Sequence, residues 1–180
     1  MATATELYNP EKINEELTKE FNYKNVHMVP RLEKIILHRG LGEATSNSKV
    51  IEYTYKQWMQ MTGQRPVLTI AKKSLSNFKL REGQIIGCKV TLRAKRMEAF
   101  YSKLVHIVLP RIRDFRGIRF KGDGRGSFTF GLSEDILFPE IGIESVDKVR
   151  GMDITFVTTA QSNEEAFALL KLMGFPFVNK

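Results

Sequence analysis

Cysteine and histidine are scarce in this sequence, and their scarcity excludes several kinds of site. One cysteine, Cys88, stands among 180 residues, so no disulfide can form within the chain, which fits a reducing compartment. The three histidines, His27, His38 and His106, are scattered, with neither a second histidine four residues away nor a cysteine nearby. Metal sites are built from closely spaced ligands of these types. We therefore expect no metal and no cofactor.

Long apolar runs are also missing. No stretch approaches the roughly 18 apolar residues that a membrane-spanning helix needs. The first 20 residues carry five glutamates and no apolar segment, unlike a secretory signal, and they are not rich in arginine, unlike a transit peptide. We expect a cytoplasmic protein that does not enter a membrane.

The motifs of common catalytic sites are absent as well. Residues 40–45, GLGEAT, begin like a dinucleotide-binding loop, but Thr45 occupies the third glycine position, so a turn is the better interpretation. Residues 122–126, GDGRG, lack the Lys and the Ser or Thr of a phosphate-binding loop. No serine stands in a G-x-S-x-G elbow. The sequence predicts a protein that is not an enzyme.

Acidic residues are sparse in the middle of the chain, and the positive charge gathers there. Residues 65–125 hold 16 of the 28 Lys and Arg residues but only 4 of the 20 Asp and Glu residues. The rest of the chain is acidic on balance, although the whole carries a net charge of +8. Such segregation favours a polyanionic partner, nucleic acid before an anionic membrane, over a basic surface kept for solubility.

Within this basic stretch, residues 88–95 alternate between apolar and polar side chains. One side would carry Cys88, Val90, Leu92 and Ala94, and the other Lys89, Thr91, Arg93 and Lys95. A period of two residues is typical of a half-buried strand. Residues 67–71 form a shorter candidate strand, and residues 72–84 between the two make a polar, basic arm that could project by about 20 Å. The exposed row and the arm are the features that a function has to explain.

Periodicity predicts the remaining elements. Helices are expected at residues 10–21, 50–62, 97–109 and 163–173, and strands at residues 31–39, 127–132 and 152–159. Residues 111–126 are too polar and glycine-rich for a core and predict a flexible basic loop, and residues 133–149 are irregular and acidic.

These elements predict a single α+β domain that spans residues 1–180. Its open, mainly antiparallel β-sheet would have helices packed on one face, and its other face would be polar, basic and exposed to a polyanionic partner. Loops would project from it at about residues 72–84 and 111–126.

Six short runs are specific enough to compare with known families. They are residues 40–44 (GLGEA), 87–93 (GCKVTLR), 110–117 (PRIRDFRG), 138–141 (FPEI), 150–154 (RGMDI) and 175–177 (FPF). Together they resemble the bacterial form of the L-five family of large-subunit ribosomal proteins, in register over nearly the whole chain. The resemblance implies a non-enzymatic component of the ribosome. It does not separate a bacterial ribosome from an organellar one.

The resemblance further implies that the exposed sheet face binds 5S ribosomal RNA in the central protuberance. Carried over by position, the contacts fall on Gln64, Thr91 and Arg93, and Lys89 lies in the same polar row. His38 stands where many relatives hold Asn. A neutral imidazole can donate one hydrogen bond and accept another, but it does not copy an amide. Contacts with 23S-type RNA and with neighbouring large-subunit proteins are implied as well.

Two more contacts follow from the resemblance, and both lie outside the sheet. Residues 72–83 resemble an arm that touches P-site transfer RNA. Its contact residues would be Lys72, Lys73, Ser74, Phe78, Lys79 and Arg81. Phe78 would either stack on a base or pack beneath the loop. The loop with Arg111, Arg113 and Arg116, together with the acidic residues 134–147, resembles the parts that meet a small-subunit head protein across the subunit bridge.

Two other classes of protein stay open on the sequence alone. An RNA-processing enzyme with a basic cleft would need a carboxylate or metal cluster inside residues 65–125, which offer only Glu82, Glu98, Asp114 and Asp123. A protein that docks on anionic membranes would need a basic amphipathic helix, and we find none in the sequence. A nuclease assay with magnesium separates the enzyme from the ribosomal protein.

Overall fold

The computed structural model describes residues 10–45, 47–142 and 148–178. The chain forms two compact units, each built from separate stretches. The first unit holds Met1–Ile35, Arg93–Phe130 and Thr155–Lys180, and the second holds Ile36–Leu92 and Gly131–Ile154. The single domain expected from the sequence stays a prediction.

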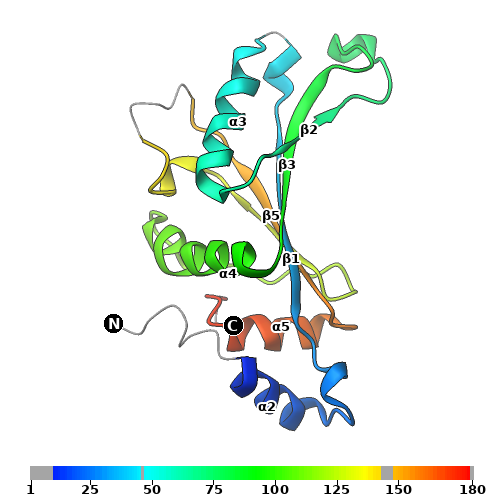
Figure 1. Ribbon diagram of the computed structural model, residues 1–180, viewed down its shortest axis with the longest axis vertical. Helices are drawn as coiled ribbons and strands as arrows, with labels where there is room; N and C mark the ends of the chain where they lie inside the picture. Colours follow the sequence, from blue (N-terminus) through cyan, green and yellow to red (C-terminus); the bar gives the residue numbers. More distant parts are fainter. Residues whose placement is uncertain (1–9, 46, 143–147, 179–180) are drawn as a thin grey trace. The chain divides into compact units, whose positions relative to one another are not determined.

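The strands form one five-stranded antiparallel sheet in the order β2-β3-β1-β5-β4 (Figure 1). They are β1 (Leu32–Gly40), β2 (Val67–Ile70), β3 (Ile85–Leu92), β4 (Phe128–Leu132) and β5 (Met152–Thr158). Strands β1, β4 and β5 each contribute residues to both units. The expected α+β class with an open antiparallel sheet is confirmed.

In the part of the chain that the structure describes, four helices and several short helical turns accompany the strands. The helices are α2 (Pro10–Phe21), α3 (Lys49–Thr62), α4 (Ala94–Lys103) and α5 (Asn163–Leu172). The 3-10 turns are Val26–Met28, Gly42–Thr45, Ser76–Phe78, Leu109–Arg111 and Asp135–Leu137, and Leu104–Val108 is a π-helical turn. Among the helices described here, none has the length and apolar character needed to cross a membrane.

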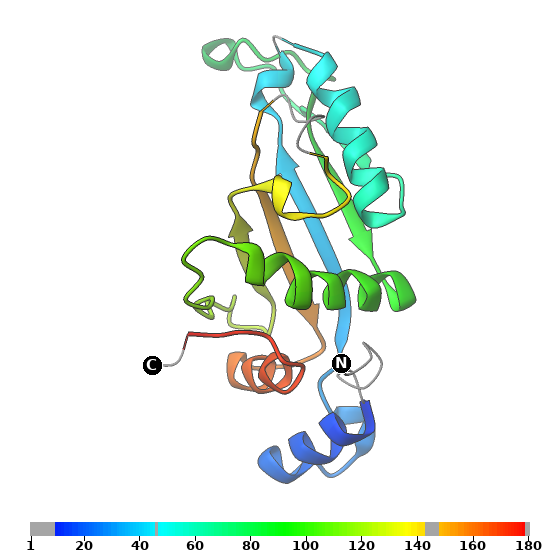
Figure 2. The same cartoon turned by 90° about the vertical axis from the view of Figure 1, so that its left-hand side faces the viewer.

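In the second unit, α3 lies along β3, as both views show (Figures 1 and 2). The side chains of Cys88, Val90 and Leu92 are buried, whereas Lys89 is exposed, which confirms the period of two over this part of the strand. Helix α3 buries Trp58 on the same core. Burial raises the pKa of the Cys88 thiol to about 12, so Cys88 is a core residue rather than a reactive one.

The expected continuation of this strand through residue 95 is wrong. Strand β3 ends at Leu92, and α4 begins at Ala94, which is exposed and has a φ of 49°. The chain changes from a period of two to a helical period at this kink, so Ala94 leaves the apolar row. The helix expected at residues 97–109 therefore starts three residues early, and it passes into the π-helical turn at Leu104.

In the first unit, α2 packs against α5, and phenylalanines fill the core. Ring contacts join Phe120, Phe128, Phe130, Phe156, Phe167, Phe175 and Phe177. Ser162 caps the start of α5, because its hydroxyl accepts the Glu165 N–H at 3.3 Å, and the Glu165 carboxylate accepts the Gln161 N–H at 2.8 Å.

Residues 111–126 were expected to stay outside the core, and this is wrong for Phe120. Its ring stacks on Phe128 with centroids 5.0 Å apart and meets Phe177 edge-on at 5.6 Å. The backbone of Ile118 bridges to Phe177, with Ile118 N–H donating to Pro176 O at 3.0 Å. One aromatic ring anchors this stretch, although the composition around it is polar.

Candidate nucleic-acid interface

The outward side of β3 carries the polar row that the sequence singled out. Lys89 is exposed and Thr91 is half-buried. On the neighbouring strand, Val67 stands opposite Lys89 and is 67% exposed. This side therefore presents a cation, a hydroxyl and an apolar side chain to a partner, while the other side of β3 faces the core.

Gln64 joins this row from the end of α3. Gly63 ends the helix in the left-handed region, with a φ of 64°, and its N–H donates to Met59 O. The next residue, Gln64, then places its side-chain Nε2 3.1 Å from the Thr91 carbonyl oxygen and donates to it. Two of the expected RNA contacts, far apart in the sequence, are thus brought together.

Arg93 lies at the junction between β3 and α4. Its backbone is extended, with φ −138° and ψ 160°, and it occupies the N-cap position of α4. The side chain is exposed and makes no capping hydrogen bond. A guanidinium in this position can make a forked contact with a phosphate or stack on a base.

His38 lies on the outward side of β1, next to Asp153, which was not among the expected RNA contacts. Its Nδ1 atom is 3.7 Å from Oδ2 of Asp153 on β5, and both side chains are exposed. Asp153 could have been found from the alternation of β5, where it stands between the buried Met152 and Ile154. A carboxylate therefore lies within this otherwise cationic and neutral row.

The residue after His38, Arg39, points the other way and is buried, with 2% of its surface exposed. Its Nε donates to Gly151 O at 2.9 Å, and its Nη2 donates to Arg150 O at 3.1 Å and contacts Asp135 Oδ2 at 3.0 Å. The guanidinium also lies 5.4 Å from the centre of the Trp58 ring. Burial lowers the pKa of Arg39, and the carboxylate of Asp135 acts against this shift.

Asp135 corrects one expectation about the acidic residues 134–147. They were expected to meet a small-subunit protein, but Asp135 is 1% exposed and engaged by Arg39, so this side chain cannot reach a partner. A buried cation requires a countercharge nearby. Phe138 and Ile141 of the same stretch are buried too. Residues 143–147 lie outside the described residues.

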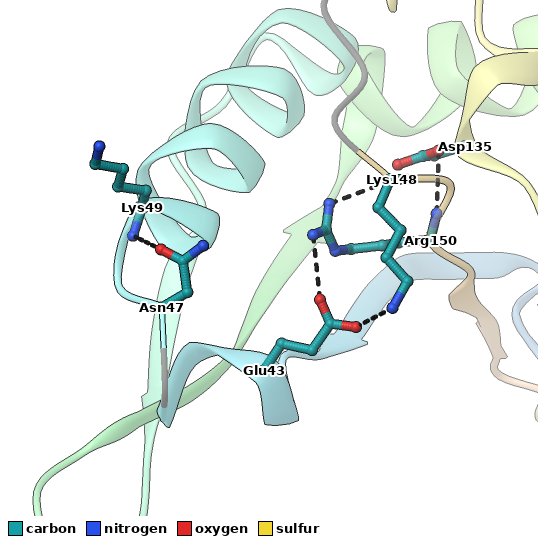
Figure 3. Close-up of polar contacts among 6 residues, drawn as sticks. All are labelled: Glu43, Asn47, Lys49, Asp135, Lys148 and Arg150. Atoms are coloured by element: carbon teal, nitrogen blue, oxygen red, sulfur yellow. Dashed lines mark hydrogen bonds and ion pairs between the residues drawn. The ribbon is translucent and has the colours of Figure 1, made fainter.

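A second ionic group, formed by Glu43, Lys148 and Arg150, is joined to Asp135 through the backbone of Arg150 (Figure 3). The Glu43 carboxylate accepts hydrogen bonds from Lys148 and, at 3.3 Å, from Arg150. These two bonds lower the pKa of Glu43. The backbone N–H of Arg150 also donates to Asp135 Oδ1 at 3.4 Å, so Arg150 connects the two groups.

Figure 3 also shows a hydrogen bond at the start of α3, where Asn47 Oδ1 accepts the backbone N–H of Lys49 at 3.1 Å.

The basic arm between β2 and β3 has its own hydrogen-bonded structure. Leu75 and Leu80 form an antiparallel bridge around the turn Ser76–Phe78. Six of its side chains were expected to contact transfer RNA, and all are exposed: Lys72, Lys73, Ser74, Phe78, Lys79 and Arg81. Phe78 is 73% exposed, so it does not pack beneath the loop.

The three arginines expected at the subunit bridge lie in the first unit. Arg111, Arg113 and Arg116 are all exposed. Between them, Asp114 adopts a positive φ of 54°. Their exposure is compatible with the expected contact, which stays a prediction.

The side chains of this interface are suited to binding a nucleic acid. Within residues 10–45, 47–142 and 148–178, no group of three or more His, Cys, Asp or Glu side chains could hold a metal ion. The outward row instead combines cations, hydroxyls, an amide and apolar surface. These are the groups that bind RNA phosphates, 2′-hydroxyls and bases.

Comparison with known proteins gives a consistent result along the whole chain. The family model for ribosomal protein L5 matches residues 25–81, and the model for the C-terminus of the same ribosomal family matches residues 85–177. The large ribosomal subunit protein uL5 of Acholeplasma laidlawii is 56% identical over 177 residues, which cover 98% of each chain. That of Symbiobacterium thermophilum is 56% identical over 91% of this chain and 92% of its own, and that of Geotalea daltonii is 49% identical over 99% and 100%.

Proposed function

This chain belongs to the ribosomal protein L5 family, and we propose that it is a structural component of the large ribosomal subunit that binds 5S ribosomal RNA through the outward side of its sheet. In this role it works in the cytoplasm, inside the ribosome, beside ribosomal RNA and other ribosomal proteins. An RNA-processing enzyme, the alternative considered from the sequence, is not needed to explain the basic surface. Members of this family are structural components.

One observation carries the proposal for the RNA-binding face. The side chain of Gln64 donates to the carbonyl of Thr91, which fixes the end of α3 beside the polar row of β3. Lys89 and Arg93 flank Thr91 in the sequence, and both are exposed. Cations can neutralise phosphates here, while the amide and the hydroxyl reach riboses or base edges.

Two further contacts belong to the same proposal. The exposed cations and Phe78 of the arm would touch P-site transfer RNA, with the ring stacking on a base. Arg111, Arg113 and Arg116 would meet a small-subunit head protein across the subunit bridge. What supports both is the exposure of these side chains together with the resemblance of the two segments to those of the family.

The experiment is a measurement of 5S ribosomal RNA affinity for the full chain and for Arg93→Ala. We expect the substitution to weaken binding by roughly 1–3 kcal/mol, because a charge-assisted contact is lost. Transfer RNA serves as the competitor at moderate salt, and 5S RNA should bind in preference to it. If the folded Arg93→Ala variant binds 5S RNA with the same affinity as the parent, the RNA site does not lie on this row.

Two lysines serve to distinguish a specific contact with RNA from a general effect of net charge. Lys89 on β3 and Lys56 on α3 are both exposed and belong to the same unit. Lys89→Ala should weaken 5S RNA binding, whereas Lys56→Ala removes the same charge from the helix and should change it little. Equal losses in the two variants would indicate unspecific attraction by net charge.

A further inference from the structure

A shallow hollow of about 230 Å³ is lined by residues at the end of β1, the end of β4 and the start of β5, all of them within the second unit. The exposed side chains of His38 and Asp153 form its walls. Gly40, Gly131 and Gly151 line it as well, so much of its surface is bare backbone. His38 and Asp153 are exposed on the outward side of the sheet, where an RNA contact is proposed for His38.

Two of these glycines leave room that any other residue would fill. A Cβ atom at Gly131 would stand 3.7 Å from Asp153 Oδ1, and one at Gly40 would have nothing within 4 Å. Neither glycine has a positive φ, so the backbone conformation itself does not demand glycine. The missing side chain of Gly131 leaves open space beside the Asp153 carboxylate, and Gly40, which also lines the hollow, adds no bulk to it.

The buried guanidinium of Arg39 holds this place together from the inner side. It donates to Gly151 O at 2.9 Å and to Arg150 O at 3.1 Å, and so ties the end of β1 to the chain entering β5. His38 directly precedes Arg39, and Asp153 stands two residues after Gly151. The hydrogen bonds of the Arg39 guanidinium on the buried side therefore help to set the distance between His38 and Asp153.

The carboxylate of Asp153 is not expected on a surface that binds only phosphates. A carboxylate repels phosphate, but it accepts hydrogen bonds from donors on the edge of a base. Guanine offers two such donors side by side, N1–H and N2–H, which match the two oxygens of a carboxylate. Unpaired bases in RNA loops are bound in this way, with an aromatic or imidazole ring stacked on the base.

We propose that this hollow binds one unpaired guanine of an RNA loop, with Asp153 accepting from N1–H and N2–H and His38 against the ring. The inference rests on the proposed function, because it assumes that the outward side of the sheet faces 5S ribosomal RNA. It adds a base-specific contact to a face that is otherwise suited to the RNA backbone.

The experiment uses the complex of the full chain with 5S ribosomal RNA and the reagent kethoxal, which modifies N1 and N2 of unpaired guanines. We expect at least one guanine to be protected by the protein. In complexes with Asp153→Asn or Gly131→Ala, that guanine should become reactive again while the rest of the footprint persists. The affinity of each variant should fall by roughly tenfold, because a bidentate base contact is lost.

Gly42→Ala is the matched control. Gly42 also has nothing within 4 Å of an added Cβ and no positive φ, but it does not line the hollow. It should leave guanine protection and affinity unchanged. Circular dichroism verifies that all three variants fold. The two test variants act differently, because Asp153→Asn removes the carboxylate whereas Gly131→Ala fills space beside it.

Three results would overturn the inference while leaving the proposed function in place. The first is an unchanged guanine footprint in both test variants. The second is tighter RNA binding by Asp153→Asn, which would show that the carboxylate only repels phosphate. The third is ribose protection at this place without guanine protection. Failure of the parent chain to bind 5S RNA would instead overturn the proposed function itself.

Discussion

Arg39 and Asp135 form a buried ion pair, and a substitution that breaks it should destabilise the fold. Asp135→Asn would leave the guanidinium buried without its countercharge, and breaking a buried pair in this way costs about 3–5 kcal/mol. The amide still offers an oxygen to Arg39, so the lost charge dominates the effect. Urea unfolding of the parent and the variant measures the change in the free energy of unfolding.

The double variant Arg39→Met with Asp135→Leu tests the same explanation by removing both charges, so that no unpaired buried charge remains. Buried ion pairs are often replaced by apolar residues at little cost, so the double variant should be more stable than Asp135→Asn alone. Glu33→Gln, which removes an exposed ion pair of 3.2 Å with Lys34, should change stability by less than about 1 kcal/mol. A cost for Asp135→Asn as small as that for Glu33→Gln would contradict the countercharge argument.

This buried pair also shows where sequence reasoning ends at the scale of single residues. The alternation of β1 places Arg39 on the same side as Ile35 and Leu37, yet an arginine at a strand end is ordinarily taken for a surface residue. Its partner lies 96 positions along the chain, in a stretch with no periodicity. Only the fold brings Asp135 beside the guanidinium.

At the scale of elements, alternation located a strand but not its end, and composition concealed a residue of the aromatic core. The period of two located β3 as far as Leu92, because one side of the strand had a core to face. The polar composition of residues 111–126 concealed Phe120, whose ring joins the aromatic core of the first unit. A single anchoring side chain gives no periodic signal. The outward row was foreseen on β3, whereas Asp153 on β5 was not among the expected RNA contacts although its strand was predicted.

The arm between β2 and β3 should be separable from the sheet to which it is attached. Its hydrogen bonds close within the arm, including the Leu75–Leu80 bridge and the bond from Glu82 N–H to Ser74 Oγ at 2.9 Å. Replacing residues 73–82 with a short turn should therefore leave the chain folded and 5S RNA binding intact, since loop length contributes little closure entropy. Retention of P-site transfer RNA on reconstituted subunits should fall.

Phe78→Ala distinguishes stacking from charge within that arm. It removes the exposed ring and leaves the arm cations in place, so it should lower transfer RNA retention without changing 5S RNA affinity. Loss of 5S RNA binding in the folded, shortened chain would assign the arm to the ribosomal RNA site. Full retention of transfer RNA in both variants would leave the arm as a solvated loop.

At the scale of the whole molecule, charge distribution should govern how binding responds to salt. The chain carries a net charge of +8, and 16 of its 28 cations fall within residues 65–125. Each phosphate that a cation neutralises releases bound counterions, so the logarithm of affinity falls linearly with the logarithm of salt concentration. We expect a steep slope for 5S RNA. Lys89→Ala should flatten it by somewhat less than one unit, because one phosphate contact is lost.

The contribution of Asp153 should appear in the same titration as a change of a different kind. Asp153→Asn alters a contact to a base, so it should shift the whole line to weaker binding while keeping its slope close to that of the parent. Lys56→Ala should change neither the affinity for 5S RNA nor the slope of its salt dependence, because that lysine lies on α3, away from the outward row. Affinity measured at four or more salt concentrations for the parent and the three variants separates these cases. A parent affinity that does not respond to salt would mean that stacking and shape, rather than the segregated charge, hold the RNA.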